Sequence, residues 1–143
     1  MNKINLENRV AIVTGGAQGF GLAITKRFIE SGARVLIWDK DTEYLNKVDL
    51  KNTQKIEVDV SNYNSVENAF AESLTHENKI DILINNAGIA GPNFKTWDYP
   101  LEEWQKVIDI DLSGVFYCCK TIVPHFIKNL SLIHISEPTR HTR

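Results

Sequence analysis

A short apolar run that ends in a cluster of glycines is the feature that most constrains the fold of this chain. Residues 10–13 are Val-Ala-Ile-Val, a pattern typical of a strand buried on both faces of a parallel sheet. Residues 14–21, Thr-Gly-Gly-Ala-Gln-Gly-Phe-Gly, follow at once, and a helical pattern begins at Gly19. In such a unit the glycines let the backbone approach a pyrophosphate, and the helix N–H groups point at that anion. Because an ordinary tight turn is the alternative, the interpretation depends on the elements that follow.

Strands and helices alternate along the rest of the sequence. Apolar runs predict strands at residues 34–38, 55–58 and 80–84, and helical periodicity predicts helices at residues 19–31, 61–75 and 101–127. In the last helix we expect Trp104, Val107, Ile108 and Val115 to face inward. This alternation implies right-handed crossovers and a parallel sheet. At 143 residues the chain has the length of one domain, and we predict a doubly wound α/β half-domain.

An acidic residue closes the second predicted strand. At this position the carboxylate of Asp39 can accept hydrogen bonds from both hydroxyls of an adenosine ribose, and its charge would repel a 2′-phosphate. The sequence therefore favours NAD over NADP. Lys40 could partly offset the repulsion, but the glycine-rich turn carries Gln18 where a basic residue would be needed. The alternative is that Asp39 is only a solvated carboxylate at a strand end.

Polar side chains also follow the third and fourth predicted strands. Asp59 can accept a hydrogen bond from an adenine amino group, it can cap the next helix together with Ser61, or it can do both. Residues 85–88, Asn-Asn-Ala-Gly, end the fourth strand, where asparagine amides can tie neighbouring strands together and reach a cofactor ribose. Combined with the glycine-rich turn and Asp39, these residues indicate a dinucleotide-binding site.

Together the motifs resemble those of the short-chain dehydrogenase/reductase family, over nearly all of residues 8–129. The resemblance implies a Rossmann-like parallel sheet with strand order 3-2-1-4 and an NAD(P)-dependent enzyme that transfers hydride to or from a small alcohol or ketone. The substrate could be that of a 3-oxoacyl-carrier reductase or of a sugar or polyol dehydrogenase. The implied cofactor contacts are Gly15, Gln18, Gly19, Phe20 and Gly21 to the pyrophosphate, Asp39 to the adenosine ribose, Asp59 and Val60 to the adenine, and Asn86 and Gly88 to the nicotinamide-side ribose.

The sequence departs from the family pattern at the catalytic residues. Asp111 stands where the family usually has Asn, and an ionised carboxylate accepts hydrogen bonds but donates none. We predict a catalytic part for Asp111 in the family's proton relay, with a plain buried helix residue as the alternative. No Tyr-x-x-x-Lys occurs, since Tyr44 and Tyr117 each have a Lys three positions on. We therefore expect the chain as written to be inactive, and a non-catalytic dinucleotide-binding module is the alternative function.

The last residues carry none of the chemistry that the preceding part predicts. Residues 130–140 match the in-frame translation of a transposase-type sequencing-library adapter. We predict a partial NAD-binding Rossmann domain over residues 1–129 and a non-native tail over residues 130–143, with a natural polar C-terminus as the alternative. The tail can mimic a fifth strand, and we expect residues 132–135 to pair beside the fourth strand. Ser136 stands one position too early to be the catalytic serine.

Charge, histidines and cysteines narrow the class of protein. The net charge of −2 favours neither nucleic acid nor an anionic membrane as a partner. The N-terminus shows no apolar signal region, and no run reaches the length of a membrane span. The adjacent Cys118 and Cys119 cannot form a disulfide framework and are expected as buried helix residues of a cytoplasmic protein. None of the four histidines has partners at metal spacing, so we expect no metal.

The resemblance also sets expectations for partners. We expect a small-molecule substrate for the full-length parent, and a homo-oligomer that assembles through the long helix at residues 101–127. The loop at residues 90–99 carries Trp97 and Tyr99, which could line a substrate pocket or could simply pack against neighbouring residues.

Overall fold

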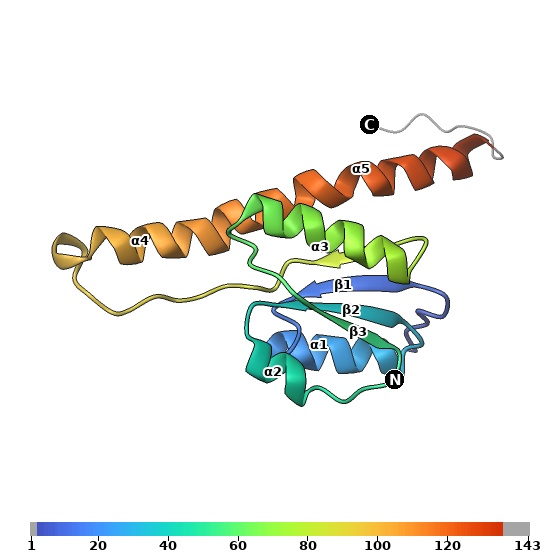
Figure 1. Ribbon diagram of the computed structural model, residues 1–143, viewed down its shortest axis with the longest axis horizontal. Coiled ribbons are helices and arrows are strands. Elements are labelled where there is room, and N and C mark those ends of the chain that lie inside the picture. Colours follow the sequence, from blue (N-terminus) through green and yellow to red (C-terminus); the bar gives the residue numbers. More distant parts are fainter. Residues whose placement is uncertain (1–2, 136–143) are drawn as a thin grey trace.

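The fold is built on one parallel sheet of four strands. The computed structural model describes residues 3–135, and the side chains of residues 3–130. The strands lie in the order β3-β2-β1-β4 (Figure 1), which confirms the predicted α/β class and strand order. Their bounds are β1 (Val10–Thr14), β2 (Arg34–Asp39), β3 (Thr53–Glu57) and β4 (Ile82–Ile84). All three pairings are parallel, and within the described residues β1 is the only strand neighbour of β4.

Helices cover both faces of the sheet. Helices α1 (Gly19–Glu30) and α2 (Thr42–Lys47) lie on one face, and α3 (Tyr63–His76) lies on the other (Figure 1). A long helix then crosses the same face as α3 and contacts it. It consists of α4 (Leu101–Ile108), a π-helical segment η2 (Asp109–Ser113) and α5 (Gly114–Ile135), and a short 3-10 turn, η1 (Thr96–Asp98), precedes it. Within residues 3–135, no helix is both long enough and apolar enough to cross a membrane.

The central strands fill the core because their side chains alternate between the two faces. Every residue of β1 is buried, as are all residues of β2 after Arg34. One face packs Ile12, Leu36 and Trp38 toward α3 and α5, and the other packs side chains such as Val13 and Ile37 toward α1. The Trp38 indole Nε1–H is satisfied by the Oγ of Ser73 on α3, at 3.1 Å. A polar group deep in the core thus fixes the position of α3 on the sheet.

Two side chains of α5 bind this helix to the sheet. Cys118 is fully buried in the core, and burial raises the pKa of its thiol to about 12, so the group remains protonated and packs as an apolar side chain. The expectation of two buried cysteines holds only for Cys118, because Cys119 is half-buried and its Sγ lies 3.6 Å from the Asn85 Nδ2 donor. His125 accepts a hydrogen bond from the Ile80 N–H just before β4, with an N–N distance of 3.1 Å.

The prediction of a fifth strand at residues 132–135 is wrong. Residues 132–135 form the last turn of α5, which ends at Ile135, and Ser136 lies outside the described residues. A short apolar run carries too little periodicity to separate a strand from a helix, and extending an existing helix is much easier than starting one. The predicted domain boundary at residues 129/130 therefore lies within α5, and the assignment of a tail remains a prediction.

Other differences concern one short helix, one side chain and the end of the long helix. Helix α2 was not predicted; it begins after Asp41, whose carboxylate accepts hydrogen bonds from the N–H groups of Glu43 and Tyr44. The prediction that Trp104 faces inward is wrong, since its side chain is 58% exposed. In the same helix Val107, Ile108 and Val115 are partly buried. The helix continues eight residues beyond the predicted end at residue 127, because Ile135 is its last residue.

The buried contact between Trp38 and Ser73 makes a direct prediction about stability. Ser73→Ala removes the acceptor of a buried indole N–H, so the free energy of unfolding should fall by about 1–3 kcal/mol. Thr75→Ala is the matched control, because its hydroxyl lies on the exposed side of the same helix and bonds only the Glu72 carbonyl. The measurement is urea unfolding followed by circular dichroism. Equal unfolding midpoints for the two variants would contradict the assigned role of Ser73.

Candidate functional site

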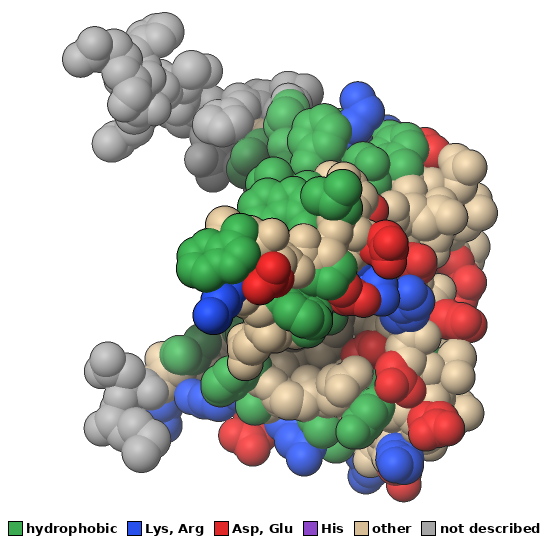
Figure 2. All heavy atoms as spheres, turned by 90° about the vertical axis from the view of Figure 1, so that its left-hand side faces the viewer, with side chains coloured by type: hydrophobic (Ala, Val, Ile, Leu, Met, Phe, Trp, Pro, Cys, Tyr) green, Lys and Arg blue, Asp and Glu red, His purple; other side chains and the backbone are tan. Residues whose placement is uncertain are grey.

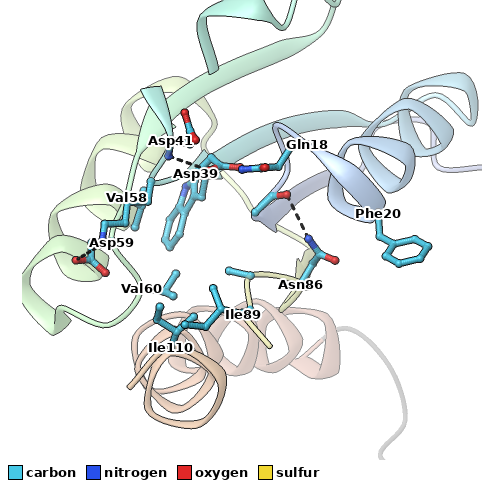
Figure 3. A pocket seen from close by; sticks show the side chains of 15 residues that line it. Gln18, Phe20, Asp39, Asp41, Val58, Asp59, Val60, Asn86, Ile89 and Ile110 are labelled. Atoms are coloured by element: carbon cyan, nitrogen blue, oxygen red, sulfur yellow. Dashed lines mark hydrogen bonds and ion pairs between the residues drawn. The ribbon is translucent and has the colours of Figure 1, made fainter. Parts of the chain in front are cut away.

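A cleft opens where the carboxyl ends of the strands meet. It has a volume of about 660 Å³, which lies within the roughly 300–1,000 Å³ typical of small-molecule and cofactor sites. In open parallel sheets ligands bind at this edge. Figure 3 shows side chains from the turn after β1, the ends of β2 and β3, the loop after β4 and the long helix converging around it. The lining residues are Gly15, Gln18, Phe20, Trp38, Asp39, Lys40, Asp41, Val58, Asp59, Val60, Asn86, Ala87, Gly88, Ile89 and Ile110.

The turn after β1 requires glycine for two different reasons. Gly15 has a positive φ of 64°, a conformation that side chains with a Cβ rarely adopt. Gly21 is needed for space, because a Cβ there would overlap the Gly15 carbonyl oxygen and lie 2.5 Å from Asn86 Nδ2. The Gln18 side chain makes no capping hydrogen bond to α1 within the described part of the chain. The first N–H groups of the helix are therefore available to an anion beside the turn.

The end of β1 is joined to the loop after β4 by Thr14. Its Oγ1 accepts hydrogen bonds from the N–H groups of Asn86 and Ala87, both at 3.0 Å, and donates one to the Ile84 carbonyl at 3.3 Å. The Asn86 amide returns two hydrogen bonds, to the Thr14 carbonyl at 3.1 Å and the Gly15 carbonyl at 3.2 Å. Asn86 thus ties the two strand ends together, one of the two roles that the sequence predicts for its amide.

Asp39 combines burial with a position at the cleft. Only 6% of its surface is exposed, although it carries a carboxylate. One oxygen accepts a hydrogen bond from the Ala17 N–H of the glycine-rich turn at 3.1 Å, and the other accepts from the Asp41 N–H at 2.9 Å. The carboxylate is thereby fixed between the turn and the start of α2, facing the cleft (Figure 3).

Asp59 lines the cleft from the segment after β3 and is held there as an anion. Burial acts to raise the pKa of its carboxyl group, but hydrogen bonds from the Ser61 hydroxyl and N–H and the nearby Lys40 ammonium outweigh burial and lower it. The Lys40 Nζ lies 3.7 Å from Asp59 Oδ2. The alternative that Asp59 caps the next helix is not what the structure shows, because Asn62 is the N-cap of α3 and accepts from the Ser65 N–H.

The far end of the cleft is formed by the loop after β4 and the π-helical segment. Gly88 and Ile89 line it from the loop, and Ile110 lines it from the helix. Asp111, the residue predicted as catalytic, does not line the cleft. Its Oδ1 accepts a hydrogen bond from the Ile89 N–H at 2.9 Å, so it contacts the loop that forms the wall. A catalytic part for Asp111 remains a prediction.

The structure brings the predicted cofactor residues together. All of them line the cleft except Gly19 and Gly21, which shape the turn beside it. Their contact with a cofactor remains a prediction. The sequence did not point to the apolar wall formed by Val58, Ala87, Ile89 and Ile110, or to Asp41. Adjacency to predicted residues could have found Val58 and Ala87, whereas Ile110 comes from a helix whose position in space no local pattern gives.

The loop at residues 90–99 lies away from the cleft. None of its described residues is among the lining residues. Tyr99 packs edge-to-face on Phe94 with ring centroids 5.8 Å apart, which agrees with the packing alternative for this residue. Trp97 is 79% exposed, and the Lys95 ammonium lies 5.5 Å from its ring centroid.

The junction at Thr14 predicts an unusually costly conservative substitution. Thr14→Val keeps the shape of the side chain but leaves the N–H groups of Asn86 and Ala87 without their acceptor, and the free energy of unfolding should fall by about 2–4 kcal/mol. Thr25→Val is the matched control, because the buried Thr25 hydroxyl makes one hydrogen bond, to the Gly16 carbonyl. Urea unfolding of both variants measures the difference. A loss for Thr14→Val no larger than that for Thr25→Val would be inconsistent with this junction.

Comparisons with known proteins agree with the architecture of the site. The family model of short chain dehydrogenases matches residues 9–136. The chain is 39% identical to the 2-dehydro-3-deoxy-L-rhamnonate dehydrogenase (NAD(+)) of Sphingomonas sp. over 123 residues, which are 85% of this chain and 49% of that protein. It is 38% identical to the 3-oxoacyl-[acyl-carrier-protein] reductase of Chlamydia pneumoniae, covering 87% of this chain and 52% of that protein.

A solved structure shows the same arrangement. The crystal structure of the 3-ketoacyl-(acyl-carrier-protein) reductase from Brucella melitensis complexed with NADH superposes with a TM-score of 0.86 at 31% identity. The match covers 90% of this chain and 54% of that one, so the chain spans about half the length of the relatives that it matches. With the family model matching most of its residues, the strand order confirmed and the glycine-rich turn at the expected place, this chain belongs to the short-chain dehydrogenase family.

Proposed function

We propose that this chain is the cofactor-binding, N-terminal half of an NAD-dependent oxidoreductase. The observation that carries the proposal is the Asp39 carboxylate, which is fixed at the cleft by the N–H of the glycine-rich turn. The full-length parent would transfer hydride between the cofactor and a small alcohol or ketone. The nicotinamide ring supplies the hydride chemistry when it is bound, and the protein binds and orients it.

Each part of the cleft has a role in this proposal. The backbone of the turn and of the start of α1 holds the pyrophosphate, through Gly15, Gln18, Gly19, Phe20 and Gly21. Asp39 accepts hydrogen bonds from the adenosine ribose, and Asp59 and Val60 contact the adenine. Asn86 and Gly88 contact the ribose on the nicotinamide side. The residues fit such a group, because Gly15 and Gly21 let the turn pack closely against Asn86, and a Cβ on Gly19 would meet nothing within 4 Å, so the turn is open where a pyrophosphate would approach.

Charge supports NAD rather than NADP. Asp39, Asp41 and Asp59 surround one end of the cleft (Figure 3), and the Lys40 ammonium there lies 3.7 Å from Asp59. The net charge at this end of the cleft is therefore negative. A 2′-phosphate on the adenosine ribose would be repelled by it, whereas two ribose hydroxyls can donate to Asp39.

The relatives support two substrate classes for the parent. One relative is named for a sugar-acid substrate and the other for a 3-oxoacyl carrier protein, and both match this chain at similar identity. This chain, which spans about half the length of these relatives, therefore does not favour one substrate class over the other. A non-catalytic dinucleotide-binding module is the second candidate, favoured by one observation: the sequence contains no Tyr-x-x-x-Lys.

Self-association and a cytoplasmic location complete the proposal for the parent. The long helix exposes a stripe of large apolar side chains, and Figure 2, which looks at the molecule from the α4 side, shows hydrophobic side chains gathered there. On α4, η2 and α5 they include Leu101, Trp104, Leu112, Phe116, Val123, Ile127 and Leu130. A surface of this kind supports a homo-oligomer of the full-length protein.

The cofactor preference can be measured on this chain. The 143-residue chain should bind NADH roughly tenfold or more tightly than NADPH, measured by isothermal titration calorimetry. Asp39→Asn should narrow this ratio, because it removes the charge that repels the 2′-phosphate. Glu43→Gln removes a charge from α2 outside the lining residues and should leave the ratio unchanged. Equal affinity of the unaltered chain for both cofactors would contradict the preference for NAD, and binding of neither would contradict the proposal itself.

The missing catalytic residues predict an absence of turnover. The chain as written should neither oxidise sugars or polyols with NAD nor reduce 3-oxoacyl thioesters with NADH, followed by NADH absorbance. Detectable turnover would show that the chain holds the chemistry assigned to its missing half. The reading frame of the source gene beyond Asn129 separates the two candidates. A downstream Ser with Tyr-x-x-x-Lys identifies an enzyme, while an uninterrupted genomic frame encoding residues 130–143 contradicts the predicted tail and favours the binding module.

A further inference from the structure

One hydrogen bond joins the long helix to the wall of the cleft. The Ile89 N–H donates to Asp111 Oδ1 at 2.9 Å, across 22 residues of sequence. Ile89 and the preceding Gly88 line the cleft, whereas Asp111 does not. The carboxylate therefore contacts this part of the wall from the side of the helix and leaves the cleft itself free.

The loop after β4 is held firmly only where it begins. Thr14 accepts hydrogen bonds from the first two N–H groups of this loop, those of Asn86 and Ala87. For residues 88–94, the bond from Ile89 to Asp111 is the only hydrogen bond found within the described part of the chain. Ile89 is 36% exposed, so packing covers its side chain only in part. Within the described residues, the hydrogen bond to Asp111 is thus the polar contact that holds Gly88 and Ile89 in the wall.

Two local features bring the carboxylate to Ile89. The π-helical segment η2 interrupts the long helix at Asp109–Ser113, and such segments alter the direction of the side chains that they carry. Ile110 in this segment lines the cleft and Asp111 follows it. A Cβ on Gly88 would lie 3.2 Å from Asp111 Oδ1, closer than an ordinary contact, so the glycine leaves room for the carboxylate.

We infer that Asp111 is a positioning residue, which fixes the nicotinamide-side wall of the cleft through Ile89 and so strengthens binding of the nicotinamide half of the cofactor. The inference rests on the proposed function. The Asp111 Oδ1 acts only as an acceptor in its contact with the Ile89 N–H. An asparagine at this position keeps an acceptor oxygen, whereas an alanine does not. The role therefore requires an acceptor and requires neither a proton nor a charge.

The test compares NADH with ADP, a probe that occupies only the adenosine half of the cleft. Both affinities are measured by calorimetry for the unaltered 143-residue chain and for Asp111→Ala, Asp111→Asn and Asp109→Ala. Asp111→Ala should bind NADH about fivefold to tenfold more weakly with unchanged ADP affinity, since one hydrogen bond to the wall is lost. Asp111→Asn should restore NADH affinity to within about twofold. Asp109→Ala is the control, because Asp109 lies in the same segment but bonds Gln105.

Several outcomes would overturn the inference. Unchanged NADH affinity in Asp111→Ala would show that the loop does not need this contact, and an Asp111→Asn variant as weak as Asp111→Ala would show that an acceptor is not sufficient. A further variant, Asp111→Leu, carries a residue that favours helix but has no acceptor. If Asp111→Ala and Asp111→Leu both lose ADP affinity and NADH affinity equally, the role of Asp111 is a general structural one. An unaltered chain that binds neither ligand contradicts the proposed function. If the unaltered chain binds both NADH and ADP, variant affinities that differ from the expected pattern count only against the positioning role of Asp111.

Discussion

The hydroxyl of Thr14 is the contact on which the rest of the site depends. Thr14 is the last residue of the buried strand β1, and its hydroxyl accepts hydrogen bonds from two N–H groups of the loop after β4. The Asn86 side chain of this loop donates in return to the Thr14 carbonyl and to the Gly15 carbonyl of the glycine-rich turn. Two segments more than 70 residues apart in sequence are thereby placed side by side. The turn can lie this close to Asn86 only because Gly21 has no side chain. The cleft is thus a consequence of how two neighbouring strands end.

The core and the site share the same strand. Trp38 and Asp39 are adjacent at the end of β2, and their side chains leave the sheet on opposite faces. Trp38 bonds Ser73 on α3, while Asp39 bonds the turn that leads into α1. The last two residues of one strand therefore fix the helix layers on both faces of the sheet. Any shift of β2 along its neighbours would move the core contact and the cleft carboxylate together.

The elements with contiguous sequence patterns were predictable, whereas contacts between distant segments were not. The unit of β1, the turn and α1 was predicted because its apolar run, glycines and helical pattern are contiguous. Strand order followed from the resemblance to a known family. The contribution of Ile110 and the contact of Asp111 were not predictable, because both depend on a π-helical segment that no residue pattern announces. The error at residues 132–135 also arises from structure outside the segment. The apolar run fits a helix or a strand equally well, and it is helical because it continues the preceding turns of α5.

The two hydrogen bonds of Asp39 tie the carboxylate at the cleft to the fold of the segments around it. Its carboxylate accepts hydrogen bonds from the N–H groups of Ala17 and Asp41. It therefore stabilises the glycine-rich turn and the start of α2 as well as facing the cleft. A substitution that admits a 2′-phosphate by removing the charge also leaves a buried backbone N–H without an acceptor. If Asp39 selects NAD as proposed, a change toward NADP therefore calls for a second, compensating substitution near residue 17 or 41. Under the proposed function, Asp39 would thus be needed for the fold of these segments as well as for the choice of cofactor.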